Sequence, residues 1–164
     1  MSGEFRESFF VIDFAVANFL NEDIVRVKNK KDIECIPLRK IKLYVLVNRF
    51  TPLAHFQTLN LEQIKDEFIA LAHTGTLSNN MLITMLDKKS CTNKIVVNSP
   101  FISQQMVAEN KAVSFATLDS PLISGYEEKI ARVELSDDLS IITAALYKKQ
   151  SEKNNLINAA IKGW

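Results

Sequence analysis

The chain has 164 residues, 47% hydrophobic and 24% charged, a composition that supports a packed core and argues against disorder. Its formal net charge of +1 gives no broad attraction to nucleic acid or to an anionic membrane. No apolar run reaches the roughly 18 residues of a membrane-spanning helix. The acidic residues Glu4 and Glu7 are also atypical of a signal peptide. We therefore expect a cytoplasmic protein without a membrane partner.

Residue usage also limits the chemistry. Cys35 and Cys91 are the only cysteines, and no CxxC spacing occurs, so reduced thiols are expected rather than a disulfide framework. With only four glycines, neither the GxxxxGK[ST] nor the GxGxxG pattern occurs. The two histidines, His55 and His73, belong to no metal-binding motif. We expect neither a metal site nor a cofactor.

The first third of the chain predicts strands. FFVIDFAVANF, residues 9–19, is an apolar run typical of a buried strand. NKKD, residues 29–32, indicates a turn. Residues 33–38 and 41–50 predict two further strands, and Pro52 ends the second one.

The next segment is ambiguous. Apolar residues between Leu61 and Leu71 have helical spacing, yet EFIALA, residues 67–72, would also make a buried strand. A helix is expected over residues 79–89, with Ser78 as its N-cap.

Residues 61–89 also permit a DNA-binding helix-turn-helix with its turn at Gly75. The second helix argues against it, because Ser78, Asn79 and Asn80 at its start offer no arginine to base edges. This interpretation stays an alternative only.

VVNSPFISQQMVAENKAVSFATL, residues 96–118, predicts a strand, a helix and a strand. Asn98 and Ser99 are helix-capping types, and Ile102 and Met106 lie four apart and predict a packing face. In α/β domains ligands bind where a strand end meets a helix start, and free N–H groups there favour an anion. Ser99 therefore either contributes to a ligand site or only caps the helix.

The rest of the chain predicts a loop, two strands and a helix. SPLISGYEE, residues 120–128, is expected to be the loop, and residues 130–135 and 139–149 alternate as strands. A closing helix is expected from Ser151. Strands and helices alternate through the middle of the chain, which predicts the α/β class.

An enzyme is one alternative function. Neither a GxSxG elbow nor an SxxK motif marks a nucleophile. His73, followed by Thr74, Gly75 and Thr76, is the candidate base of a small hydrolase or transferase, or else part of an ordinary turn.

Residues 36–71 resemble the crossover region of the LysR-type transcriptional regulators. In that family a strand leads into an hPLA motif, a short L-x-x-L helix and the first strand of the second lobe. TPLA, residues 51–54, matches the motif, with threonine where histidine is usual. Leu61 and Ile64 match the short helix, which then predicts a helix to about Lys65 followed by a strand.

Three other segments carry the resemblance. Residues 12–16 are similar to the family's lDlai strand, residues 96–118 to its aGlGialLP segment, and residues 130–149 to the return to the first lobe. The sequence departs from the family at residues 110–112, where G-x-G is common, and at Asp119, where proline often stands. The family's winged helix-turn-helix and the start of its first lobe have no counterpart here.

The resemblance implies a two-lobed α/β domain, similar to type 2 periplasmic-binding proteins, with one lobe incomplete. The second lobe would span residues 58–118, and the first would combine residues 1–57 and 119–164. A small effector that bears a carboxylate would bind in the interlobe cleft and shift the arrangement of the lobes without a reaction. The expected ligand-binding residues are Asn98, Ser99, Phe101, Ser103, His73, Thr74, Thr117 and Asn18.

The resemblance also bears on partners. It implies a homo-oligomer, because the expected helix around Met81–Leu86 lacks the first-lobe helix that covers it in the family, and it implies DNA contact only through a domain absent from this chain. Two alternatives stay open. One is a stand-alone small-molecule-binding or dimerisation protein of the same fold, and the other is the small enzyme using His73.

Overall fold

The computed structural model describes residues 14–72, 77–139 and 141–149, together with positions 155, 159 and 161. The chain divides into two compact units, of which unit 1 is Met1–Arg39 with Ile142–Trp164 and unit 2 is Lys40–Ile141. The chain therefore passes between the units twice.

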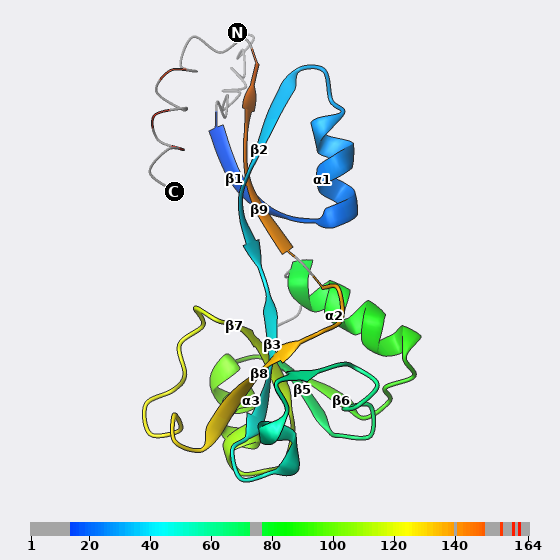
Figure 1. The fold of residues 1–164 in the computed structure, drawn as a ribbon, viewed down its shortest axis with the longest axis vertical. Coiled ribbons are helices and arrows are strands. Elements are labelled where there is room, and N and C mark those ends of the chain that lie inside the picture. The colour runs from blue at the N-terminus through cyan, green and yellow to red at the C-terminus, as the bar shows by residue number, and fades with distance from the viewer. Residues whose placement is uncertain are drawn as a thin grey trace, which may run out of the picture. The chain divides into compact units, whose positions relative to one another are not determined.

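Unit 1 contains a three-stranded sheet and a helix (Figure 1). Its strands, in order across the sheet, are β1 (Phe14–Leu20), β9 (Ile141–Lys148) and β2 (Ile33–Ile41). Helix α1 (Asn21–Lys28) buries Ile24 against a small core that contains Cys35 of β2 and Ala144 of β9. The strand that comes last in the sequence thus lies at the centre of the sheet.

Two sequence-based expectations for unit 1 need correction. Helix α1 was not predicted, because it is short and its apolar residues Ile24, Val25 and Val27 are too few to show a period. Ile24 is buried and Val27 packs against the same core, whereas Val25 is 56% exposed. Strand β1 is present, but it is not buried: Phe14 is 36% exposed and Val16 is 40% exposed, so one of its faces is open.

Unit 2 is built on a four-stranded sheet with the order β4-β8-β3-β7. Its strands are β4 (Thr58–Leu59), β8 (Ile130–Leu135), β3 (Leu43–Asn48) and β7 (Ser114–Thr117). β3 is antiparallel to both neighbours, with Val45 opposite Val133 of β8 and Phe115 of β7. Val45 and Val133 are buried, as expected of a central strand and its partner.

Two more strands, β5 (Ile69–Ala72) and β6 (Lys94–Val97), pair in parallel. The backbone N–H of Ala70 donates to the Val113 carbonyl at 2.9 Å, which places β5 between β6 and β7. β6, β5 and β7 therefore run in the same direction. Their carboxyl ends, at Val97, Ala72 and Thr117, lie at one edge of the unit.

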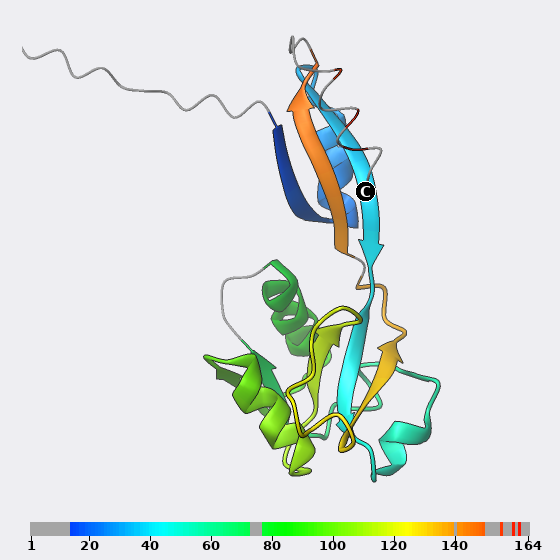
Figure 2. The same ribbon diagram turned by 90° about the vertical axis from the view of Figure 1, so that its left-hand side faces the viewer.

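Two helices connect the parallel strands, α2 (Leu77–Lys88) and α3 (Pro100–Ala108), and both are visible in Figures 1 and 2. Leu86 of α2 packs in the same core as Val45 of β3, whereas Val107 of α3 packs against Leu46. Successive strand residues point to opposite faces of a sheet, so α2 and α3 cover different faces.

The strands predicted at residues 33–38 and 41–50 are found as β2 and β3, and the 3-10 helix η1 (Pro52–His55) follows, as expected of the proline. The short helix predicted to about Lys65 is wrong. Residues 61–66 form successive turns, closed by bonds such as that from the Glu67 N–H to the Ile64 carbonyl at 3.1 Å.

The DNA-binding helix-turn-helix interpretation is wrong as well. Strand β5 lies between the turns at residues 61–66 and helix α2, so two helices joined by a turn do not occur there. Helix α2 begins at Leu77, which places Ser78 inside the helix rather than at its N-cap.

The buried side of α3 differs from the predicted one. The side chains that α3 buries are Ser103, Gln104, Val107 and Ala108. Ile102, expected to pack, is 40% exposed. The helix is rotated by about one residue from the apolar spacing, because two polar side chains find hydrogen-bond partners inside.

The unit boundaries also differ from the lobes expected from the sequence, which were residues 1–57 with 119–164 and residues 58–118. β3 and β8 lie outside residues 58–118, yet their hydrogen bonds join them to β7 and β4 within unit 2. The sheet, rather than the crossover motif, thus sets the extent of this unit.

No helix among the described residues is long and apolar enough to cross a membrane. Over the same ranges, His, Cys, Asp and Glu side chains form no group of three or more that could hold a metal ion. Cys35 and Cys91 are buried free thiols, and burial raises the pKa of each, which keeps them protonated and unreactive.

Candidate functional site

The start of helix α3 is formed by the residues that follow β6. Ser99 has an extended backbone with φ −146° and ψ 135°, and its Oγ accepts a hydrogen bond from the Phe101 N–H at 3.1 Å. Pro100 occupies the first turn, where its missing N–H costs no hydrogen bond. The predicted cap is therefore confirmed.

This cap leaves few donors free at the helix start. The Phe101 N–H is bound by Ser99, and the Ser103 N–H reaches the Ser99 carbonyl at 3.4 Å. The Ile102 N–H has no acceptor among the described residues. It points along the axis of a nine-residue helix whose dipole favours an anion there. The Ser99 hydroxyl retains its own proton as a second donor.

Phe101 and Ser103 face different surroundings. Phe101 is 49% exposed, and its ring lies 6.4 Å from that of Tyr126 with the planes inclined by 57°. Ser103 is 2% exposed, and its hydroxyl donates to the Pro100 carbonyl at 3.0 Å. Phe101 is thus available beside the helix start, and Ser103 is engaged within the helix. Asn98 is exposed directly before the cap.

Thr117 ends β7 at the same edge of the unit as Val97, the last residue of β6. Its backbone N–H and its hydroxyl both contact the Ser120 Oγ, at 3.2 and 2.8 Å. The Thr117 hydroxyl is therefore engaged in closing a turn, and the Ser120 hydroxyl lies beside it at the end of β7.

The loop after β7 is fastened to α3 by Gln104. Its Nε2 donates to the Pro121 carbonyl at 3.1 Å, and its Oε1 accepts from the Ile123 N–H at 2.9 Å. Arg132 of β8 donates to the Ser120 carbonyl, and its Nε is buried without a hydrogen-bond partner in the described part of the chain. No local pattern in the sequence indicates the roles of Gln104, Ser120 or Arg132, because each contact joins segments that are separated in the chain.

The other candidates lie elsewhere. Asn18 is inside β1 rather than beyond it, and its Oδ1 accepts a hydrogen bond from the Thr143 hydroxyl at 2.8 Å in unit 1. His73 and Thr74 lie outside the described residues. Asn98, Ser99, Phe101 and Thr117 are the predicted residues that belong to the carboxyl edge of the unit 2 strands.

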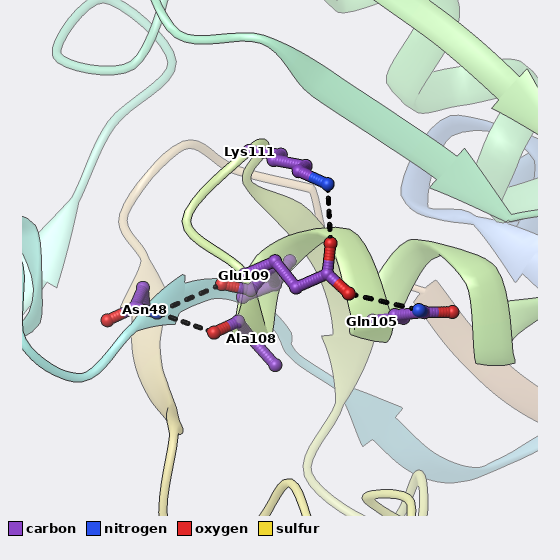
Figure 3. Close-up of polar contacts among 6 residues, drawn as sticks. Asn48, Gln105, Ala108, Glu109 and Lys111 are labelled. Carbon is purple, nitrogen blue, oxygen red and sulfur yellow. Dashed lines mark hydrogen bonds and ion pairs between the residues drawn. The ribbon is translucent and has the colours of Figure 1, made fainter.

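The opposite end of α3 carries a polar network (Figure 3). The buried Asn48 Nδ2 donates to the carbonyls of Ala108 and Val107 at the end of α3, at 2.9 and 3.3 Å. The Val107 carbonyl also accepts the Asn110 N–H at 3.0 Å, so the Ala108 carbonyl depends on Asn48 more. Glu109 binds Lys111 at 2.6 Å and Gln105 at 3.0 Å, and these two contacts lower the pKa of its carboxyl.

No family model and no curated protein matches the sequence. Solved structures do match. The reduced OxyR regulatory domain from Pseudomonas aeruginosa is 16% identical, with a TM-score of 0.65 over 92% of this chain and 71% of that chain. The reduced form of OxyR from N. meningitidis is 14% identical, with a TM-score of 0.66 over 92% and 70%. The effector-binding domain of a BenM variant is 16% identical, with a TM-score of 0.66 over 93% and 70%.

These matches identify the fold. The chain has the α/β, periplasmic-binding-protein-like fold of LysR-type regulatory and effector-binding domains, as predicted from the sequence. It spans 47% of full-length OxyR from Pseudomonas aeruginosa, against 71% of the isolated regulatory domain. At this level of identity the likeness establishes architecture, and the function has to be argued from the site.

Proposed function

We propose that this chain is an effector-binding regulatory domain of the LysR type, which senses a small carboxylate in the cytoplasm and carries out no reaction. The observation that carries the proposal is the start of α3 at the carboxyl edge of β6, β5 and β7. Ligands of α/β proteins bind at this edge, and regulatory domains of the same fold include one described as effector-binding.

The chemistry of the helix start supports an anionic ligand. The Ile102 N–H and the Ser99 hydroxyl proton are two donors at the positive end of the α3 dipole. Phe101 offers an apolar surface next to them. Asn98 and the Ser120 hydroxyl beside Thr117 are polar groups at the same edge. A carboxylate attached to a small apolar body matches this set of groups.

Ligand binding of this kind acts through differential affinity. An effector that binds one arrangement of the domain more tightly than another shifts the population toward it, and the shift is limited by the difference in affinity. We further propose that the domain self-associates, since regulators of this type act as oligomers in the family that the sequence resembles.

Two substitutions at Ser99 test the site. Ser99→Ala removes the hydroxyl donor and leaves the Ile102 N–H, so carboxylate affinity should fall by roughly 1–3 kcal/mol. Ser99→Asp places a fixed negative charge where the ligand carboxylate would lie, so affinity should fall further. The measurement is calorimetric titration of the full chain with a panel of small carboxylates.

Thermal melting separates the ligand role from the cap. Ser99→Ala should lower the stability of the protein by about 1 kcal/mol, whereas Ser99→Asp should preserve it, because aspartate is an equally good N-cap. Stability and affinity therefore move apart in Ser99→Asp. If an identified carboxylate binds all three proteins equally, Ser99 is a helix cap only and the proposed site is wrong.

A further inference from the structure

A second hollow in unit 2 lies at the other ends of the same strands. It has a volume of about 430 Å³. Its lining includes Val47 at the end of β3, together with Phe68 and Val113, which precede β5 and β7. It therefore lies at the amino edge of the parallel strands, whereas the α3 start lies at their carboxyl edge. We call it the amino-edge cavity.

The walls of the amino-edge cavity are held by hydrogen bonds. The Val113 N–H donates to the Phe68 carbonyl at 2.8 Å and fixes one side. The Thr51 hydroxyl donates to the Asn48 carbonyl at 2.7 Å and fixes another. Lys111 is held at the end of α3 by a bond from its N–H to the Met106 carbonyl at 2.8 Å. A site that is already ordered loses little entropy when a ligand binds.

The charged residues of the lining are Glu67 and Lys111. The Lys111 ammonium lies 2.6 Å from the Glu109 carboxylate, which neutralises it (Figure 3). The Glu67 carboxylate has no ion pair or hydrogen bond to any other residue in the described ranges. The uncompensated charge of the cavity is therefore negative.

The remaining lining combines apolar side chains with the polar residues Asn48, Thr51 and Asn110. Its apolar residues are the buried Val47 and Val113, the 41% exposed Phe68, and Pro52, Leu53 and Ala112. Phe68 directly follows Glu67 in the chain, and both of these exposed residues line the cavity. Such a pair suits an organic cation, through a charge-assisted hydrogen bond and a cation–π contact.

We propose that the amino-edge cavity binds a small organic amine, with Glu67 as its counter-ion and with Phe68 and Leu53 in contact with its hydrocarbon part. The volume lies within the usual range for small-molecule sites, about 300–1,000 Å³. This site is separate from the carboxylate site at the α3 start and takes a ligand of opposite charge, so each proposal stands without the other.

The test compares three ligands that share one ring. The full chain is titrated with benzylamine, benzyl alcohol and benzoate up to millimolar concentration, and backbone amide shifts are recorded by NMR. Benzylamine should produce saturable shifts at Phe68, Ala112 and Val113. Its affinity should exceed that of benzyl alcohol by about tenfold or more, the effect of one charge-assisted contact. Benzoate should leave these three amides unmoved.

A matched pair of variants locates the charge. Glu67→Gln keeps the size of the side chain and removes its charge, so benzylamine should bind no better than benzyl alcohol. Asp66→Asn removes the same charge one position earlier, at an exposed residue that does not line the cavity, so affinity should be unchanged. Equal losses in both variants, equal binding of all three ligands, or shifts confined to other amides would each overturn the proposal. Melting temperatures of both variants verify that the fold is intact.

Discussion

Ser90 and Asn110 both have a left-handed backbone, with φ of 57° and 56°. Each lies just beyond a helix whose last carbonyls it helps to satisfy. After α2, the Ser90 N–H bonds to the Asp87 carbonyl and the Cys91 N–H to the Leu86 carbonyl, at 3.0 and 2.9 Å. This pattern is the Schellman motif, in which glycine is the usual residue. Asn110 lies where the resembled family has glycine, and asparagine tolerates the left-handed region best among the other residues.

Replacing these residues by glycine should therefore have graded effects. Ser90→Gly should raise the free energy of unfolding by about 0.5–1 kcal/mol, and Asn110→Gly should raise it less. Gly125 allows the opposite substitution, because its φ is +90° and an added Cβ would meet no atom within 4 Å. Gly125→Ala should cost about 1 kcal/mol from backbone strain alone. Urea denaturation measures all three, and a destabilised Ser90→Gly would contradict this account of the α2 end.

Asn48 offers a second test at the scale of one residue. Asn48→Asp is nearly isosteric, but it replaces the donor that satisfies the Val107 and Ala108 carbonyls with an oxygen that repels them. The Val107 carbonyl keeps its bond from the Asn110 N–H at 3.0 Å, whereas the Ala108 carbonyl loses its partner. The free energy of unfolding should therefore fall by roughly 1–3 kcal/mol at neutral pH. Asn93→Asp makes the same chemical change at an exposed position and should stay within about 0.5 kcal/mol of the parent. Similar losses in both proteins would show that Asn48 does not clamp α3.

At the scale of the elements, the sequence predicts what local chemistry decides. The strands β2, β3, β7, β8 and β9 follow from apolar runs between turn residues, and Ser99 with Pro100 identifies the start of α3. These signals involve neighbours in the chain, so they survive without knowledge of the fold. The predicted helix start is also the central feature of the proposed carboxylate site.

The features that depend on distant segments were not predictable in this way. α3 buries Ser103 and Gln104 because the Pro100, Pro121 and Ile123 backbone groups satisfy them, and no periodicity of hydrophobic residues reports such partners. The same holds for Arg132, and for the amino-edge cavity, whose lining combines three separate stretches of chain. The sequence of residues 61–66 has helical spacing because Leu61 and Ile64, three positions apart, are both fully buried, although the backbone there forms successive turns.

At the scale of the whole molecule, the two units differ in how the chain builds them. Unit 2 is one continuous segment, Lys40–Ile141. This segment includes every residue of the two hydrophobic cores that pack on its sheet, and it also includes α2 and α3. We expect residues 40–141 to fold alone, with a cooperative thermal transition by circular dichroism and dispersed amide signals by NMR. Residues 1–39 alone should stay unfolded, because they lack β9. A fragment 40–141 without a cooperative transition would show that unit 2 depends on unit 1.

The central position of β9 also has a consequence for the protein during its synthesis. β1, α1 and β2 are synthesised before unit 2, yet the central strand of their sheet, β9, emerges only after unit 2. At typical translation rates the wait is on the order of ten seconds. Throughout that interval both strands expose unpaired edges, while unit 2 is synthesised and folds. This segment is therefore made before unit 2 and acquires its structure after it, and during that interval its open strand edges need protection from aggregation.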